Sequence, residues 1–482
     1  ATIDHSVSSS PLLREHSADR AAALGPSPRS ASLVRLPAVG GSGRSAASHR
    51  TVLFLQGPAS TLWSQIAARF QERGHKTLRV NLSFGDWLFW GGRRGINYQG
   101  SLKNWETWLE ALMRRENVSD VLYFADRLPY HRIAAAVAER LGARAWVVEN
   151  GYLRPDWLTL EPVAMGRHSR FTRDPETIRA LARGCPMPSF APRYPVPFRV
   201  EATNEVAFNL AHVLGRALFP RYVSDKAVAP AIEYLGWLPH LALAAWRRRE
   251  AESVVSAATS PGAPPFWLVA LQMETDYQIR ASSDFSGQAE LLELVIGSFA
   301  RRAEPSARLV VKIHPFDNGL ISWSRVAKRF AKQFGVTGRV SVIRGGNLDR
   351  LVRAARGLVT INSTTAVHAL RIGCPVIALG DAVYDLPGLT HQSGIERFWG
   401  AAEAPDRSFL EDWCRALAAE IQVRGSQMNP EGRAAAAEEI VRRIEAAHRY
   451  WRLYDDEPEA ATVEPPTTSA EPISPQRRAG AA

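Results

Sequence analysis

Residues 309–315 read Leu-Val-Val-Lys-Ile-His-Pro, a short apolar run that ends in a lysine, a histidine and a proline. The run has the composition of a buried strand, and Pro315 ends it because proline has no amide hydrogen to donate to a sheet. Alternate side chains of a strand share one face, so Lys312 and His314 are predicted to approach the same phosphate. The alternative is a strand-end histidine bonded to the backbone.

This strand belongs to a block in which apolar strands alternate with helices, and the block begins after a proline-rich break at residues 261–265. The predicted strands are 266–271, 309–313, 340–343, 358–361 and 376–379, and the predicted helices are 286–302, 323–334, 348–355 and 365–372. This alternation is typical of a parallel sheet covered by helices.

An earlier block shows the same alternation. Its predicted strands are 51–55, 76–82, 120–124 and 143–148, with one helix ending at residue 72 and another over 130–141. The chain is therefore predicted to be an α/β protein with two doubly wound, Rossmann-type domains. Facing domains of this kind would bring the carboxyl ends of both sets of strands to a central cleft.

The predicted organisation divides the chain into six segments. They are a disordered tail at 1–49, an N-terminal domain at 50–203, a helical connector at 204–260, a C-terminal domain at 261–430, a helix at 431–454 that crosses back to the first domain, and a disordered tail at 455–482. The tails are rich in Ser, Ala, Gly and Arg or in Pro, Glu, Thr and Ala, and such compositions do not build a core.

The composition narrows the class of protein. A formal net charge of +11 favours an anionic partner, but the chain shows no zinc-finger, helix-turn-helix or RNP-like motif, so nucleic acid is not expected. The three cysteines have no C-x-x-C spacing, which fits a reducing cytoplasm. No stretch reaches the roughly 20 apolar residues that span a bilayer. No metal-binding motif is evident, so neither a metal nor a cofactor is predicted.

Two polar segments follow predicted strands of the second block. In the first, Asp276 is expected to act as a nucleophile or a charge stabiliser toward a phosphate-activated donor substrate. Gln272 and Gln278 are expected to contact the same donor. A loop acid that caps the next helix is the alternative for Asp276. In the second, Asn362 precedes Ser363 and Thr364 at a helix N-terminus, where amide and hydroxyl groups suit an anion. Every good helix cap has this composition, so an ordinary cap is the alternative there.

The first block offers a second carboxylate. Glu149 follows a strand directly and is predicted to take a proton from an acceptor hydroxyl, while Arg154 holds an anionic group. A Glu–Arg ion pair that pins the loop is the alternative. Further acceptor contacts are predicted at Ser60, Asp86, Asp126, Arg127 and His131.

Taken in order, these segments resemble the KpsS-type capsular polysaccharide synthesis proteins, which are retaining β-Kdo transferases. The matching segments are Gly57 with Ser60, 81–86, 126–132, 149–155 with 159–161, 271–279, 312–315 and 362–365. The resemblance covers about residues 50 to 450. The family motif Glu-Glu-Gly has Asn150 as its second residue here, which leaves Glu149 as the acid/base residue.

The resemblance implies a GT-B-like, metal-independent enzyme that moves Kdo from CMP-Kdo to a lysophosphatidylglycerol-type lipid with retention and so starts a poly-Kdo linker. By analogy, Asp276 is the nucleophile and Glu149 the acid/base residue. The predicted contacts to the CMP phosphate are His314, Lys312, Ser363 and Thr364. The expected location is peripheral, on the cytoplasmic side of the inner membrane, with other capsule synthesis and export proteins as further partners.

A lipid acceptor suits a basic, tryptophan-bearing chain. The segment 87–90, Trp-Leu-Phe-Trp, with Arg93 and Arg94 is expected at an anionic interface, and an ordinary packed loop is the alternative.

Three other functions remain open from the sequence. One is a different GT-B-type transferase or a sugar-nucleotide epimerase, another is a non-catalytic scaffold of capsule assembly and export, and the third is a nucleic-acid-binding protein.

Overall fold

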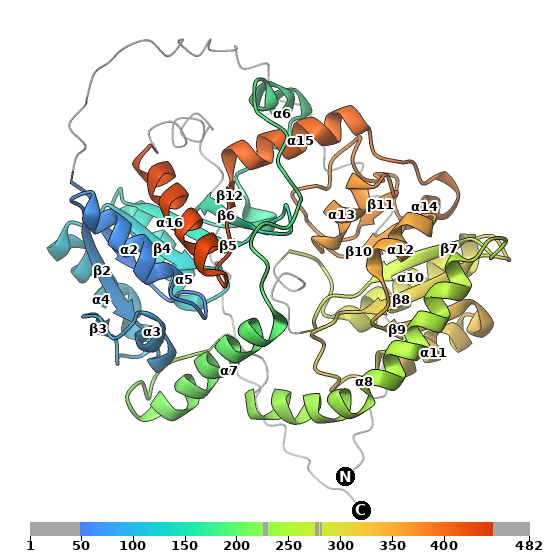
Figure 1. Ribbon diagram of the computed structural model, residues 1–482, viewed down its shortest axis with the longest axis horizontal. Helices are drawn as coiled ribbons and strands as arrows, with labels where there is room; N and C mark the ends of the chain where they lie inside the picture. Colours follow the sequence, from blue (N-terminus) through green and yellow to red (C-terminus); the bar gives the residue numbers. More distant parts are fainter. Residues whose placement is uncertain (1–48, 225–229, 275–278, 280–281, 447–482) are drawn as a thin grey trace, which may run out of the picture. The chain divides into compact units, whose positions relative to one another are not determined.

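The computed structural model describes residues 49–224, 230–274, 279 and 282–446 (Figure 1). The described chain contains two separate sheets. One has seven strands in the order β12-β6-β5-β4-β1-β2-β3, and the other has five in the order β11-β10-β7-β8-β9. Two mainly parallel sheets with flanking helices confirm the predicted fold class. The predicted disordered tails lie almost wholly outside the described residues.

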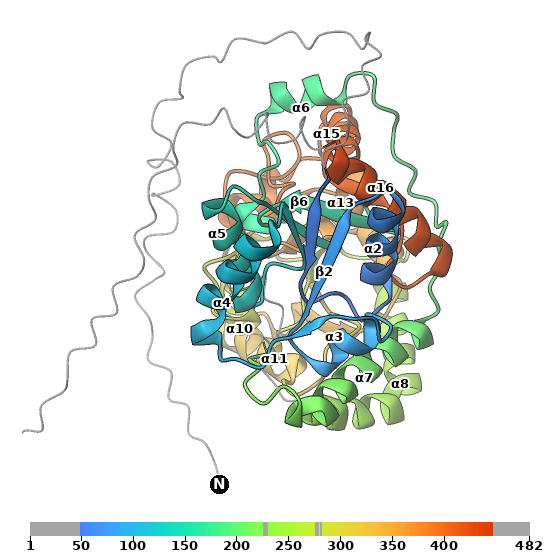
Figure 2. The same ribbon diagram turned by 90° about the vertical axis from the view of Figure 1, so that its left-hand side faces the viewer.

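The first sheet is built from strands β1 (Thr51–Phe54), β2 (Lys76–Asn81), β3 (Ile96–Asn97), β4 (Asp120–Phe124), β5 (Arg144–Asn150), β6 (Trp157–Pro162) and β12 (Gln422–Arg424). Its helices are α2 (Leu62–Glu72), α3 (Phe84–Phe89), α4 (Leu102–Glu116) and α5 (Pro129–Arg140). Helices α4 and α5 lie on the opposite side of the sheet from α2 (Figure 2). Arg73 at the end of α2 pairs with Glu438 of α16 (Pro430–Glu445), so α16 lies beside α2.

Two strands of this sheet depart from the parallel arrangement predicted for the first block. Strand β6 runs antiparallel to β5, and β12 runs antiparallel to β6. Only residues 151–156 separate β5 from β6. That connection is too short for the crossover that a parallel neighbour needs, so the chain turns back on itself. Strand β12 also returns the chain to the first sheet before residue 431, where the crossing helix was predicted to begin.

The second sheet is built from β7 (Phe266–Ala270), β8 (Arg308–Ile313), β9 (Val340–Arg344), β10 (Leu358–Thr360) and β11 (Val376–Ala378). Its helices are α10 (Gln288–Arg302), α11 (Trp323–Gln333), α12 (Leu348–Ala354), α13 (Thr365–Arg371), α14 (Ile395–Ala401) and α15 (Arg407–Glu420), and a short 3-10 helix η4 (Thr337–Arg339) precedes β9.

Strand β7 shows how the second sheet separates two cores. Phe266, Leu268 and Ala270 pack into a core that includes residues of α12, α13 and α15. Trp267 and Val269 pack on the other face, with residues of α10 and α11. Because side chains alternate along a strand, a continuous apolar run such as this one requires cover on both faces.

The connecting segments are largely helical. They contain η2 (Gly166–His168), α6 (Pro175–Ala182), α7 (Phe198–Leu214), η3 (Gly215–Ala217) and α8 (Pro230–Thr259). Residues Phe171, Ile178 and Ala182 join the core of the second sheet. No helix in the described part of the chain is both long enough and apolar enough to cross a bilayer.

Candidate functional site

Glu149 lies in the penultimate position of β5 and is half-buried. In the antiparallel pairing it stands opposite Thr159 of β6, and Thr159 stands opposite Gln422 of β12. Glu161 pairs with Val147, two residues before Glu149, so both carboxyl groups project from the same face of the sheet. The candidate acid/base residue therefore sits in a row of polar side chains across neighbouring strands.

Gln422 holds the loop that follows Glu149. Its side-chain oxygen accepts hydrogen bonds from the amides of Tyr152 at 2.8 Å and Leu153 at 3.3 Å, and its nitrogen donates to the Thr159 hydroxyl at 2.9 Å. Gln422 is fully buried, so these bonds are shielded from water. This residue was missed from the sequence, because nothing local links it to a loop 270 positions away.

Gly151 fills a place in this loop where a side chain does not fit. A Cβ at this position would lie 2.5 Å from the Trp157 carbonyl oxygen and 2.6 Å from the Gln422 side-chain oxygen. The loop that follows Glu149 is thus packed closely against β6 and β12.

Gly151→Ala is therefore expected to lower the free energy of unfolding by about 1–3 kcal/mol, because the new methyl group displaces the Trp157 carbonyl or the Gln422 amide. Activity is expected to fall as well. Chemical denaturation measures the change in the free energy of unfolding. Gly400→Ala is the matched control, since a Cβ at Gly400 meets nothing within 4 Å. Equal stabilities of the two variants would contradict the tight packing.

Two carboxyl groups lie near Tyr152, that of Glu161, which is fully buried, and that of Asp126, which is half-buried. Glu161 accepts hydrogen bonds from the hydroxyls of Ser169 and, at 3.4 Å, Tyr152. Asp126 accepts from the Met165 amide at 3.0 Å. Burial raises the pKa of Glu161 to about 8 and the pKa of Asp126 above its usual range. A carboxyl group with a raised pKa holds its proton near neutral pH. Glu161 was quoted among the matching segments of the sequence, but no role was predicted for it.

The other predicted acceptor contacts fall into two groups. Arg127 and Arg154 are exposed, and Asp126 is half-buried at the end of β4. Ser60, Asp86 and His131 are almost fully buried. The side chains of these three residues are therefore held inside the first domain, whereas the two arginines reach the surface.

Asp86 and His131 each hold a loop by local bonds. Asp86 pairs with Arg79 at 2.9 Å and accepts hydrogen bonds from the amides of Leu82 and Ser83, both at 3.0 Å. The His131 Nδ1–H donates to the Ala125 carbonyl at 2.7 Å. Burial lowers the pKa of His131 to about 3, so the ring stays neutral. These contacts stabilise the two loops, and the predicted acceptor contacts of Asp86 and His131 stay predictions.

On the second sheet, Gln272 and Asn362 meet at the ends of neighbouring strands β7 and β10. The Gln272 side-chain nitrogen donates to the Asn362 side-chain oxygen at 2.9 Å. The backbone amide of Asn362 donates to Gln272 Oε1 at 3.2 Å. Gln288 accepts from the Gln272 backbone amide at 2.7 Å. The structure thus brings together two predicted donor contacts. Asp276 and Gln278, the predicted nucleophile and a further donor contact, lie outside the described residues.

His314 directly follows β8, as predicted. Its Nδ1 accepts a hydrogen bond from the Phe316 amide at 3.1 Å, so the neutral ring carries its proton on Nε2. Lys312 is buried, which lowers its pKa, and its ammonium group donates to the Gly345 carbonyl at 2.8 Å. The backbone after His314 is held by Asp317, which accepts from the Trp323 indole at 2.8 Å.

Ser363 and Thr364 precede α13 at the predicted place. Thr364 is the N-cap residue, and its side chain makes no capping hydrogen bond. The Ser363 hydroxyl instead accepts from the Thr365 amide at 3.2 Å, and the Tyr384 hydroxyl donates to the Ser363 carbonyl at 2.7 Å. The first turn of α13 is therefore anchored through Ser363.

A short bridge joins the two groups of site residues. The amide of Arg167 donates to the Ser282 hydroxyl at 3.3 Å, and its guanidinium lies 3.3 Å from an Asp381 oxygen. Ser282 in turn accepts, through its carbonyl, from the Asn362 side chain at 3.3 Å. Arg167 follows Met165 closely, and Met165 binds Asp126. Hydrogen bonds thus connect the Asp126 edge of the first sheet to the Asn362 edge of the second.

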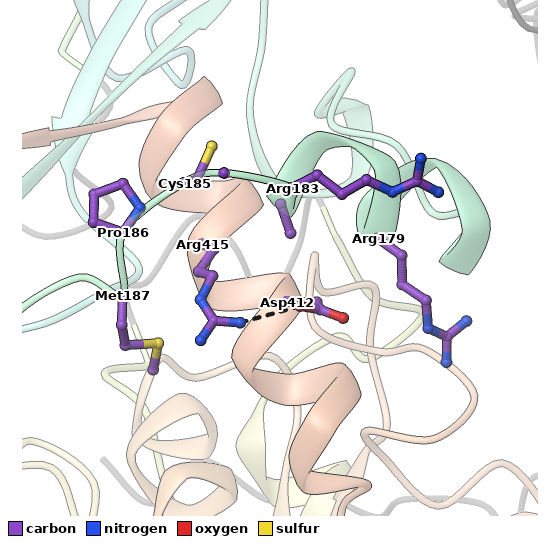
Figure 3. A pocket seen from close by; sticks show the side chains of 9 residues that line it. Arg179, Arg183, Cys185, Pro186, Met187, Asp412 and Arg415 are labelled. Carbon is purple, nitrogen blue, oxygen red and sulfur yellow. Dashed lines mark hydrogen bonds and ion pairs between the residues drawn. The ribbon is translucent and has the colours of Figure 1, made fainter.

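A cavity of about 570 Å³ lies away from these residues, between α6 and α15 (Figure 3). Arg179, Arg183, Arg415 and Asp412 line it, and Arg415 pairs with Asp412 at 3.2 Å. None of the predicted site residues lines this cavity.

Comparisons with known proteins agree with the resemblance found in the motifs. The chain is 29% identical over 388 residues to the capsule polysaccharide export protein KpsS of Escherichia coli, covering 78% of this chain and 96% of that relative. It is 27% identical over 368 residues to the capsule polysaccharide modification protein LipB of Neisseria meningitidis, covering 75% and 88%. Among solved structures it is similar to the β-Kdo 2,7 transferase KpsC of Thermosulfurimonas dismutans, with 16% identity, a TM-score of 0.39, and coverage of 82% and 99%.

The family model described as capsule polysaccharide biosynthesis protein matches residues 119–427. That span runs from β4 to the segment after β12, and so includes Glu149, Gln272, His314, Asn362 and Gln422. Together with the KpsS relative, the match confirms the predicted resemblance. This chain belongs to the capsule polysaccharide biosynthesis protein family.

Proposed function

We propose that the chain is a glycosyltransferase that moves Kdo from CMP-Kdo to a lysophosphatidylglycerol-type lipid with retention of configuration, and so initiates the poly-Kdo linker of a capsular polysaccharide. The observation that carries the proposal is the Arg167 bridge, which sets the Asp126 edge of one sheet beside the Asn362 edge of the other. A transferase needs a donor site and an acceptor site next to each other, and this bridge supports that arrangement. Membership of a capsule biosynthesis family supports the substrate class.

The proposed reaction has two displacements. In the first, the Asp276 carboxylate attacks the anomeric carbon, the bond to the CMP phosphate breaks with its electron pair, and CMP leaves. In the second, Glu149 takes the proton of the acceptor hydroxyl while the hydroxyl oxygen attacks the same carbon and Asp276 leaves. Two inversions give net retention. No metal is assigned to the reaction, and His314 with Lys312 is proposed to stabilise the departing phosphate.

The segment that carries Asp276 starts from a fixed point. The backbone amide of Gln272 is held by Gln288, and Glu274 accepts a hydrogen bond from the Gln288 amide at 3.0 Å. Gln272 and Glu274, which precede Asp276 in the chain, follow the carboxyl end of β7, where ligands of doubly wound sheets bind.

The test is product analysis with purified protein, CMP-Kdo and a synthetic phosphatidylglycerol-type acceptor. Mass spectrometry is expected to detect the acceptor with added Kdo, and CMP release is expected to require CMP-Kdo among the sugar nucleotides supplied. Asp276→Ala is expected to lower turnover by at least about 10³-fold, because it removes the nucleophile. Turnover with another sugar nucleotide and none with CMP-Kdo would refute the donor assignment.

The name of the Escherichia coli relative, capsule polysaccharide export protein, favours a second candidate, a non-catalytic scaffold of capsule assembly and export. The two candidates differ in cells. A scaffold predicts normal capsule from the Asp276→Ala variant, whereas a transferase predicts its loss.

A further inference from the structure

Helix α7 exposes an apolar stripe to solvent. Val206, Leu210, Val213 and Leu214 recur at the spacing that puts residues on one side of a helix, and they are between 43% and 72% exposed. The residues that α7 buries are instead Asn209 and Ala211. A surface helix ordinarily shows the reverse pattern, with its leucines inside. Contiguous exposed apolar residues of this kind mark an interaction site.

The orientation of α7 is fixed by its packing on α3. The rings of Phe208 and Phe89 lie 5.9 Å apart, and a Cβ at Gly85 would lie 2.9 Å from the Phe208 ring. A Cβ at Gly215, just past α7, would overlap the Phe84 ring. Phe208 thus anchors one side of α7 and leaves the apolar stripe on the outside, and both ribbon views draw α3 against α7 (Figures 1 and 2).

Further exposed apolar residues lie on α3, which packs on the Phe208 side of α7, and in the segment after α7. We call the whole set the α3–α7 apolar face, and it consists of Trp87, Leu88, Val206, Leu210, Val213, Leu214 and Leu218. Phe89 is only half-exposed, and Trp90, which the sequence placed at the same interface, is buried beneath the Arg79 guanidinium at 5.4 Å. Trp87 and Leu88 are exposed, so their place at an interface stays a prediction, whereas the burial of Trp90 contradicts it for that residue.

The cations around this face suit an anionic partner. The exposed arginines on α7 and after it are Arg199, Arg216 and Arg221, whereas Arg93 and Arg94 after α3 lie beside residues of α2, where Arg93 donates to the Ser64 carbonyl at 3.4 Å. Arg199 precedes Val206 by seven residues and so stands on the line of the stripe. The acids of α7, Glu201 and Glu205, lie more than about 100° round the helix from the centre of the stripe. Apolar residues flanked by arginines are the pattern of a helix that lies in an anionic bilayer surface.

The α3–α7 apolar face is joined by the chain to the loops of the first sheet that are predicted to contact the acceptor. We call these loops, which include Gln56, Asp126 and Arg127, the acceptor edge. The Tyr222 hydroxyl donates to the Gln56 side chain at 3.1 Å, and the Val223 amide donates to the Tyr130 hydroxyl at 3.2 Å. Gln56 follows β1, and Tyr130 opens α5 just after Asp126 and Arg127. The chain that leaves α7 therefore runs directly to the loops predicted to contact the acceptor.

We propose that the α3–α7 apolar face docks on an anionic phospholipid bilayer and presents the acceptor edge to lipids of that bilayer. The delivery of an acceptor rests on the proposed function, whereas the docking does not. Trp87 and the leucines enter the interface between headgroups and acyl chains, and the arginines contact lipid phosphates. The charge pattern favours this partner over a second copy of the chain, because two such faces would bring arginines together.

Vesicle flotation tests the docking. Wild-type protein is expected to bind vesicles of phosphatidylcholine with phosphatidylglycerol and to bind pure phosphatidylcholine vesicles more weakly. Leu210→Glu with Leu214→Glu is expected to weaken binding at least about tenfold, since two charges replace the centre of the apolar stripe. Arg216→Glu with Arg221→Glu is expected to weaken it about fivefold or more for each arginine, with a strong salt dependence. Arg325→Glu with Lys328→Glu on α11 is the matched control and is expected to bind as wild type does.

A spectroscopic measurement covers the case in which a double variant fails to fold. Brominated lipids are expected to quench part of the tryptophan fluorescence of the wild-type protein, and Trp87→Phe is expected to remove that part. Equal vesicle binding by all variants would overturn the proposal. So would a change from dimer to monomer in the Leu210/Leu214 variant with vesicle binding intact, because the face would then be a protein interface.

The proposed function has its own readout. Transfer of Kdo to a water-soluble short-chain acceptor is expected to be unchanged in the docking variants, because they leave the site residues in place. If vesicle binding behaves as described and no transfer occurs to any acceptor, the function fails and the docking face stands.

Discussion

Glu149→Gln is expected to lower kcat by about 10² to 10⁴-fold while the protein stays folded, because glutamine keeps the size and polarity of the side chain but cannot take a proton. Glu149 is half-buried at the end of β5, opposite Thr159, in a row that Gln422 fixes from β12. The substitution leaves these neighbours in place. The loss is therefore assigned to the chemical step.

The proposed two-displacement mechanism predicts a second property of the Glu149→Gln variant. Attack by Asp276 needs no base, so Glu149→Gln is expected to release about one CMP per enzyme molecule and then stop, with Kdo attached to the peptide that contains Asp276. Rapid-quench measurement of CMP and mass spectrometry of the digested protein detect both results. Glu139→Gln is the control, since Glu139 is exposed on α5. Wild-type turnover by Glu149→Gln would exclude this residue from the chemistry.

The second large expected effect is the pH dependence that Glu161 gives to the free energy of unfolding. Glu161 is fully buried, and its pKa in the folded protein is raised to about 8, whereas an ordinary glutamate titrates near 4.5. Between these two values the folded chain holds a proton that the unfolded chain has lost. The contribution of Glu161 to the free energy of unfolding therefore decreases as the pH rises from about 4.5 to 8, by up to about 5 kcal/mol.

Glu161→Gln is expected to remove this dependence, because glutamine is neutral throughout and keeps a polar group beside Tyr152 and Ser169. Relative to wild type, the variant is expected to gain several kcal/mol of stability from pH 5 to pH 9. Urea denaturation at pH 5, 6.5, 8 and 9 measures the difference. Glu139→Gln provides the baseline, and a wild-type slope in Glu161→Gln would show that Glu161 is ionised in the folded protein.

The longer parallel strands of both blocks were predictable from the sequence because each is a compact apolar run between turn signals, whereas the two-residue parallel strand β3 was missed. Strand β4 begins and ends where it was predicted. Strand β6 was missed because it follows Pro155 and Asp156, which read as a loop, and because its pairing depends on the chain returning beside β5. Strand β12 has three residues, too few for any periodicity.

The residues of the candidate site also divide into those that the sequence predicts and those whose role depends on the folded structure. Glu149, Gln272, His314 and Asn362 stand at strand ends, and strand ends are readable from sequence. Asp86 and His131 were predicted to contact the acceptor, and this stays a prediction because loops that bind ligands and loops that cap themselves use the same residue types. The raised pKa of Glu161 likewise depends on Tyr152 and Ser169 closing over it, which no local pattern reveals.

Strand β12 has a consequence for how the molecule is made. The loop beside Glu149 is completed by Gln422, which leaves the ribosome some 270 residues after that loop. A nascent chain can form β1 to β6 early, but Tyr152 and Leu153 then lack the acceptor for their amides. Nearly the whole polypeptide must therefore be synthesised before the proposed catalytic centre is complete, so fragments that end before residue 422 are expected to be inactive.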